Sequence, residues 1–112
     1  MMLLSVALTG CVSAVSLVSA DGDYRGTSTR FLALEPRNCP RPRVYSRLPV
    51  RSGTLFLPWV GQYVQVSVRG TGSVIGSLPG GQVTGTYDGT VIKAKLQDGR
   101  CGLEYTLKRE PG

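Results

Sequence analysis

The stretch Gln62–Arg69 (QYVQVSVR) decides the fold, because apolar and polar residues alternate along its whole length. Successive side chains of a β-strand point to opposite faces of a sheet, so its three valines would share one face and its polar residues the other. Val91–Leu96 and Cys101–Lys108 repeat this alternation. The three stretches therefore predict strands that bury one face in a core.

The rest of the chain after residue 20 also consists of short runs that end at glycine or proline, and none holds the 3.6-residue period of a helix. Glycines between residues 69 and 99 can supply the positive φ of tight hairpin turns, and Asp-Gly is the strongest cue for a type I′ turn. The further expected strands are Tyr24–Leu34, Val44–Leu48, Thr54–Leu57, Ser73–Leu78 and Val83–Tyr87, and the turn segments are Arg69–Gly72, Leu78–Gly81, Tyr87–Gly89 and Gln97–Gly99.

These elements predict an all-β fold, an antiparallel meander of about eight short strands. Strands paired in sequence order either form an open sheet with two exposed edges or curl until the first strand meets the last, and closure removes edges that promote aggregation. We expect a small barrel or roll, with a two-sheet β-sandwich as the alternative. Residues 21–112 would form this single domain.

The first 20 residues are the expected export signal. They contain no charged residue, and the small residues at Val18-Ser19-Ala20 suit signal peptidase, so cleavage before Asp21 is predicted even though no Lys or Arg precedes the apolar run. All 13 Lys and Arg and all seven Asp and Glu lie from Asp21 onward. The predicted mature part therefore keeps the full formal net charge of +6.

Cys11 offers a second processing route. Leu8-Thr9-Gly10-Cys11 looks like the lipobox of bacterial lipoproteins, in which the cysteine becomes diacylated. Residues 12–20 would then tether the domain to a membrane. The alternative is a cysteine that lies inside a signal peptide, and on either route Cys11 cannot join the folded domain.

Cys39 and Cys101 are the two remaining cysteines, and an even pair in an exported chain without histidine predicts a disulfide. Closing about 62 residues would stabilise the fold by about 4 kcal/mol through the lost entropy of the unfolded chain. Two isolated cysteines are too few ligands for a metal site, and they lack the C-x-x-C spacing of redox-active thiols.

Residue types that carry catalysis are sparse. The chain has no His, the side chain that most often serves as a base near neutral pH. Most of its seven carboxylates stand in expected turns or near the termini, where solvent keeps them ionised. The sequence predicts a protein that is not an enzyme and has no catalytic residue, no metal and no cofactor.

Residues 37–51 form the most basic segment, with five arginines and no acidic residue. Arginine binds phosphate and sulfate bidentately, so the expected partners are anionic lipid headgroups, lipopolysaccharide phosphates or an acidic protein face. Tyr45 is the one aromatic residue in the segment, which argues against nucleic acid. The alternative is a solvated proline-rich loop that guards a strand edge. The candidate anion-binding residues are Arg37, Arg41, Arg43, Arg47 and Arg51.

Leu55–Val60 is the most apolar segment after residue 20, and it contains the single tryptophan, Trp59. Beside Pro58, this ring could line the mouth of a barrel and contact a ligand. The alternative is that Trp59 is the largest packing element of a thin core.

Three segments, DGDYRGTSTR at 21–30, NCP at 38–40 and DGRCGLEYT at 98–106, resemble small exported proteins of Gram-negative bacteria, most of which have no assigned function. The resemblance implies an origin in the bacterial envelope and a Cys39–Cys101 pair. It transfers no activity and no catalytic residue.

The sequence thus favours a non-catalytic binding module that is periplasmic or secreted, with the arginine-rich segment and the Trp59 region as contact surfaces. One alternative is a disulfide-stapled inhibitor of a hydrolase, for which a rigid β scaffold is suitable. Another is a lipid-anchored structural protein of the envelope, which would contact a membrane only through an acylated Cys11.

Overall fold

The structure of the protein is a computed structural model that describes residues 19–111. Cys11 and most of the predicted signal segment lie outside the described residues, so the predicted cleavage and lipidation stay predictions. Between residues 19 and 111, no helix is long and apolar enough to cross a membrane.

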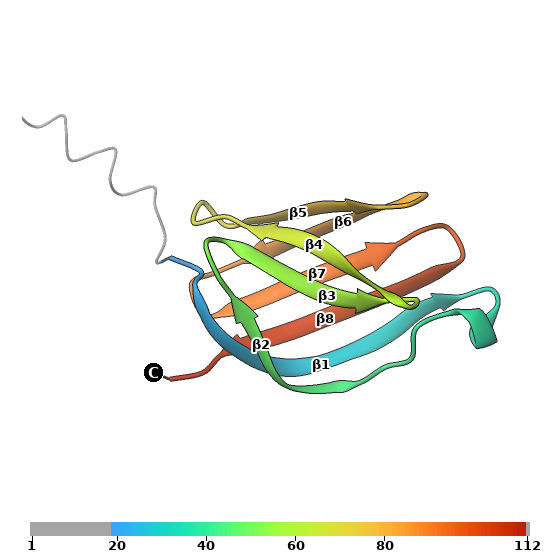
Figure 1. Cartoon of the computed structure of the whole chain (residues 1–112), viewed down its shortest axis with the longest axis horizontal. Helices are drawn as coiled ribbons and strands as arrows, with labels where there is room; N and C mark the ends of the chain where they lie inside the picture. Colours follow the sequence, from blue (N-terminus) through green and yellow to red (C-terminus); the bar gives the residue numbers. More distant parts are fainter. Residues whose placement is uncertain (1–18, 112) are drawn as a thin grey trace, which may run out of the picture.

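Eight antiparallel strands follow one another along the chain, which confirms the all-β prediction (Figure 1). Each strand starts and ends within two residues of its expected bounds. A 3₁₀ turn, η2 (Pro36–Asn38), lies between the first two strands. The strands are β1 (Gly22–Ala33), β2 (Val44–Val50), β3 (Thr54–Trp59), β4 (Gln62–Val68), β5 (Ser73–Leu78), β6 (Gly81–Tyr87), β7 (Val91–Gln97) and β8 (Cys101–Arg109).

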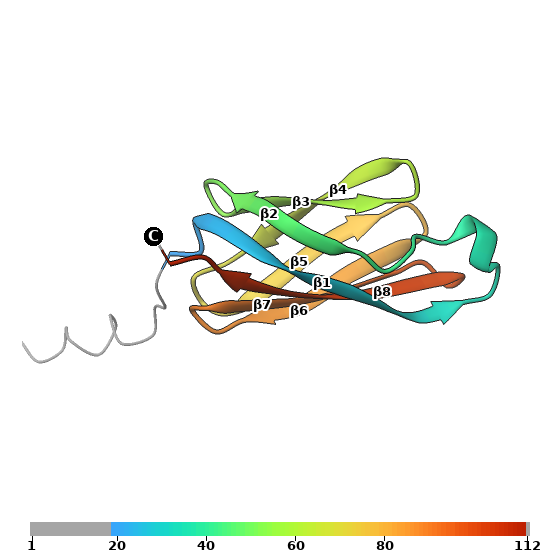
Figure 2. The same cartoon turned by 90° about the horizontal axis from the view of Figure 1, so that it is seen from below.

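The strands form one sheet in the order β2-β1-β8-β7-β6-β5-β4-β3. β1 pairs with β8, so the first strand meets the last, as expected of a barrel. The sheet curls until β3 approaches β2 (Figures 1 and 2), where an isolated bridge, Arg51↔Thr54, joins the two edge strands. The result is a nearly closed barrel and not a two-sheet sandwich.

Alternate residues of the strands fill the interior of the barrel. Val64, Val66 and Val68 are at most 4% exposed, which confirms the inward face predicted for this stretch. Removing such apolar side chains from water is the main force that drives folding. Trp59 is also buried, with 3% of its surface exposed. The matching inward residues of β7 and β8 are Ile92, Ala94, Leu96, Cys101, Leu103, Tyr105 and Leu107.

The Asp-Gly turns differ from the expected type I′. At Asp88 and Asp98 the aspartate precedes the two central residues, and positive φ occurs at the first central residue, Gly89 (100°) or Gly99 (90°), as in type II′ turns. The Asp88 carboxylate accepts the backbone N–H groups of the two residues after Gly89, at 2.9 and 2.7 Å. The Asp98 carboxylate likewise accepts the backbone N–H groups of Arg100 and Cys101. An aspartate that accepts these two N–H groups stands at the residue before the two central residues of the turn.

Cys39 and Cys101 form the predicted disulfide, with their Cα atoms 5.4 Å apart. Cys39 follows η2 and Cys101 opens β8, so the bond ties the β1–β2 connection to the β7–β8 turn. The Leu34 N–H donates to the Arg100 carbonyl at 2.8 Å beside the same junction. A disulfide indicates an oxidising compartment.

The segment before β1 packs onto the other end of the barrel. The Tyr24 hydroxyl donates to the Ala20 carbonyl at 2.8 Å, and the Tyr87 hydroxyl donates to the Ser19 carbonyl at 3.0 Å. Ala20 is 3% exposed and joins the core. Burial raises the pKa of Tyr24 to about 12, so this hydroxyl keeps the proton that it donates.

Arg109 completes this attachment. Its guanidinium donates to the carbonyl oxygens of Ser19 and Asp21 and to the Tyr87 hydroxyl. It also lies 5.2 Å from the ring centroid of Tyr24 and 6.0 Å from that of Tyr87, within the range of cation–π attraction. We call Tyr24, Tyr87 and Arg109 the N-terminal clasp. Ser19 and Ala20 precede the predicted cleavage site, so the contacts with them belong to the uncleaved chain, whereas cleavage before Asp21 would keep those of Arg109 with Asp21, Tyr24 and Tyr87.

Asp21 connects the clasp end to the turn between β2 and β3. Its carboxylate accepts the backbone N–H groups of Ser52 at 2.9 Å and of Gly53 at 2.8 Å. Ser52 and Gly53 have φ values of 53° and 73°, the positive pair that a type I′ turn requires. The hydrogen bonds from Gly53 and Ser52 lower the pKa of the Asp21 carboxyl.

Candidate anion-binding groove

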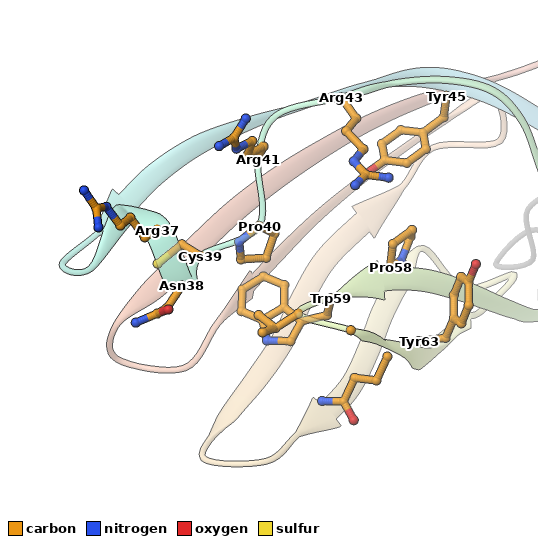
Figure 3. A pocket seen from close by; sticks show the side chains of 13 residues that line it. Arg37, Asn38, Cys39, Pro40, Arg41, Arg43, Tyr45, Pro58, Trp59 and Tyr63 are labelled. Atoms are coloured by element: carbon orange, nitrogen blue, oxygen red, sulfur yellow. The ribbon is translucent and has the colours of Figure 1, made fainter.

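A groove of about 560 Å³ lies between the loop that follows η2 and the turn that joins β3 to β4 (Figure 3). It occupies the end of the barrel that carries the disulfide, opposite the end where β1 begins and β8 ends (Figure 1). We call it the arginine groove. Its cationic wall contains Arg37, Arg41 and Arg43, and its aromatic residues are Tyr45, Trp59 and Tyr63.

The groove exists because β2 and β3 separate beyond the Arg51↔Thr54 bridge. In the middle of this gap, the Tyr105 hydroxyl donates to the Pro58 carbonyl at 2.8 Å, in place of a hydrogen bond between strands. The Tyr45 ring lies 5.8 Å from the Tyr105 ring, measured between centroids. Burial raises the pKa of Tyr105, which keeps its hydroxyl a donor. The two tyrosines close the middle of the gap, and the groove opens next to them.

The three arginines of the cationic wall are exposed. Arg37 belongs to η2, and Arg41 and Arg43 follow on the proline-containing loop that leads to β2. No Asp or Glu of residues 19–111 lies within 4.0 Å of their guanidinium groups. The wall therefore presents positive charge that no neighbouring carboxylate offsets.

Contacts with β1 hold the backbone of this wall. The Ser28 N–H donates to the Arg43 carbonyl at 2.9 Å, and the Ser28 hydroxyl accepts the Arg43 N–H at 3.0 Å. The Arg30 guanidinium donates to the Pro40 carbonyl at 3.4 Å. With the disulfide at Cys39, these contacts fix the loop at three points, so the wall is formed before any ligand arrives.

The opposite wall is aromatic. Trp59 ends β3 and Tyr63 lies near the start of β4, and Figure 3 shows them across the groove from Arg41 and Arg43. Tyr63 is 72% exposed, so its ring is available to a ligand. Between these strands, Val60 has a φ of 21°, a conformation that is rare for a β-branched residue. Val60 and Gly61 are the central residues of the two-residue hairpin between β3 and β4, whose turn needs a positive φ at both.

The structure divides the five predicted arginines between the two ends of the barrel. Arg47 and Arg51 lie at the clasp end, where both approach the Asp23 carboxylate, at 3.3 and 3.0 Å. The hydrogen bond from Arg51, with the charge of Arg47, lowers the pKa of the Asp23 carboxyl. Arg37, Arg41 and Arg43 are brought together in the groove. Trp59 lies in the core and also lines the groove, so both interpretations of this residue describe part of its environment.

Sequence reasoning missed five residues at or beside the groove, namely Ser28, Arg30, Asn38, Gln62 and Tyr63. Tyr63 faces outward in the alternating stretch, and its position opposite Pro58, one pair from the turn that follows Trp59, was a usable signal. Arg30 borders a smaller hollow with Arg37 and Arg41 on the outer side of the loop, but it lies outside the arginine-rich segment. Ser28 gave no signal, because its role depends on the pairing between β1 and the loop.

Acidic residues near the groove already have partners. Glu35 and Asp98 line a hollow that continues from the groove around the end of the barrel. Glu35 pairs with Arg100 at 3.3 Å, and Asp98 accepts the backbone N–H groups of Arg100 and Cys101. These carboxylates therefore stabilise the turns around the disulfide.

The groove offers guanidinium, amide and aromatic groups. Over residues 19–111, no three His, Cys, Asp or Glu side chains are grouped so that they could hold a metal ion. Fold and site together define a small disulfide-bonded β-barrel with a cationic groove. No protein-family model, curated protein or solved structure matches it.

Proposed function

We propose that the protein is an exported, non-catalytic binding module that engages an anionic partner through the arginine groove. The observation that carries this proposal is the contrast between its arginines. Arg37, Arg41 and Arg43 face the groove without a carboxylate partner in the described chain, whereas Arg47 and Arg51 share Asp23. A guanidinium without a carboxylate neighbour can donate both of its parallel N–H groups to a phosphate, sulfate or carboxylate of a ligand.

The charge of the whole molecule supports the same partner class. A formal net charge of +6 attracts anions over the entire surface, and a groove with one sign of charge concentrates that attraction. Binding of this kind weakens as salt screens the charges.

Prolines on both edge strands argue against a partner that adds a strand to the sheet. Pro49 on β2 and Pro58 on β3 have no N–H to donate to such a strand. The Pro58 carbonyl, in addition, already accepts the Tyr105 hydroxyl. Because strand addition is disfavoured at both edges, we expect a partner to be recognised by the side chains of the groove.

The compartment that we propose is the periplasm or the cell exterior. The Cys39–Cys101 disulfide supports an oxidising environment, and the resemblance to exported proteins of Gram-negative bacteria supports the envelope. The candidate partners there are phosphate-bearing envelope components or an acidic protein face. Anchoring through an acylated Cys11 is compatible with the same groove.

The test compares two pairs of substitutions that remove equal charge. Arg41→Gln with Arg43→Gln alters the groove, and Arg47→Gln with Arg51→Gln alters the clasp end. Each protein is loaded on a dextran sulfate matrix and eluted with a salt gradient. We expect the groove variant to elute at clearly lower salt than the wild type, and the other variant to elute close to the wild type. Equal shifts would show that binding follows net charge and would contradict the proposal.

A further inference from the structure

We propose that the ligand of the arginine groove is an acidic saccharide, meaning a sugar ring that carries phosphate, sulfate or carboxylate. This inference rests on the proposed function, because it names the ligand class of the same site. It comes from the groups that the groove presents in addition to its arginines.

The aromatic wall is the first of these groups. A free inorganic anion would need the arginines alone, yet the groove places Tyr63, Trp59 and Pro58 opposite them. Tyr63 presents an exposed ring, which is a surface for the C–H face of a sugar. A ligand that uses both walls must carry charge on one side and an apolar face on the other.

Two amide side chains are the second group. Asn38 and Gln62 are exposed and line the groove, and an amide both donates and accepts hydrogen bonds, as sugar hydroxyls require. The Asn38 amide N–H donates to the Glu35 carboxylate at 3.4 Å, which leaves its carbonyl oxygen to accept a hydroxyl.

The size and the edges of the groove favour a saccharide over a peptide. Its volume of about 560 Å³ lies within the usual range of small-molecule sites and has room for a short oligosaccharide. An extended peptide is recognised largely through its backbone, and Pro49 and Pro58 remove the donors that such pairing needs.

The experiment separates the contribution of ligand charge to the affinity from that of the sugar rings. It uses isothermal titration calorimetry of the full domain with three probes. Sulfated cellotetraose carries both features, unsulfated cellotetraose carries the rings alone, and tetraglutamate carries charge alone. The variants are Tyr63→Ala, which removes the exposed ring, and Arg43→Gln, which removes a charge. Phe56→Ala is the matched control, because Phe56 is a 53% exposed aromatic side chain of β3 that does not line the groove.

We expect sulfated cellotetraose to bind at least about tenfold more tightly than either other probe, and Tyr63→Ala to weaken it by about tenfold. Arg43→Gln should weaken both charged probes, Tyr63→Ala should leave tetraglutamate unchanged, and Phe56→Ala should alter nothing. If tetraglutamate binds as tightly and Tyr63→Ala has no effect, the saccharide inference is wrong while the proposed function stands. If no charged probe binds, or if Arg43→Gln is without effect, both are wrong.

Discussion

The arginines of the cationic wall differ in their partners from those at the clasp end. At the clasp end, Arg109 donates to carbonyl oxygens of the segment before β1, and Arg47 and Arg51 share the Asp23 carboxylate. At the groove end, the three arginines of the cationic wall have no such carboxylate within residues 19–111. The carbonyl and carboxylate acceptors around an arginine therefore decide whether its guanidinium holds the fold together or is left for a ligand.

The two ends also differ in what holds them together. A disulfide fixes the groove end, whereas hydrogen bonds and cation–π contacts fix the clasp end. Since η2 and its loop contribute few buried side chains, the covalent bond replaces packing there. Each end can therefore be weakened separately.

The largest expected effect comes from removing the disulfide. Replacing Cys39 and Cys101 with serine should lower the free energy of unfolding by about 4 kcal/mol, because the unfolded chain regains the freedom of a loop that spans 62 residues. Urea denaturation of the variant and of the wild type, with and without reductant, measures this change. An unfolding midpoint that neither the substitution nor reductant moves would contradict this account of the groove end.

Removing the guanidinium of the clasp should cost less. In the chain that retains Ser19, Arg109→Met should lower the free energy of unfolding by about 2 kcal/mol, because the carbonyl groups of Ser19 and Asp21 and the Tyr87 hydroxyl lose charged hydrogen bonds. Arg25→Met is the matched control, since this exposed arginine lies 3.9 Å from Glu110 and should contribute almost nothing. Equal losses in the two variants would show that the clasp adds no specific stability.

Acid should weaken the clasp end through Asp21. The backbone N–H groups of Gly53 and Ser52 lower the pKa of this carboxyl below its ordinary value of 3.8, so folding favours the ionised form. The stabilisation is present above the ordinary value and is lost as the pH falls through the lower pKa of the folded state. An NMR titration of the carboxyl carbon should give a pKa below 3.8, and Asp21→Asn should reduce the acid dependence of unfolding. Titration at or above the ordinary value would refute this prediction.

The smallest expected effect on stability belongs to the groove arginines. Arg41→Gln with Arg43→Gln should change the free energy of unfolding by less than about 0.5 kcal/mol, because both side chains are exposed and have no carboxylate partner in residues 19–111. Thermal unfolding measures this directly. A large loss would mean that these arginines serve the fold, like those at the clasp end.

The alternating sequence predicted the strands, because a period of two residues is a local feature. The even cysteine count predicted the disulfide, and the expected closure of the meander predicted the contact between β1 and β8. The sequence did not predict that the arginine-rich segment would divide. Arg43 and Arg47 are four residues apart, yet one reaches the groove and the other reaches Asp23. Their destinations depend on where β2 begins to pair with β1, and that register is a property of the whole sheet.

The aromatic wall and the clasp were hidden for the same reason. Tyr63 and Arg43 line opposite walls of a groove between β2 and β3 that exists only after the sheet has curled. Tyr24, Tyr87 and Arg109 lie on three different strands, and nothing in the local sequence of any one indicates the other two.

One NMR titration compares the two ends in a single sample. Sulfated cellotetraose is added to nitrogen-15-labelled protein, and the side-chain Nε–H signals of arginine are followed. The account predicts saturable shifts of the Arg37, Arg41 and Arg43 signals, while those of Arg47, Arg51 and Arg109 stay in place. Uniform small shifts of all arginines, or shifts confined to the clasp end, would contradict the claim that the groove is the binding site.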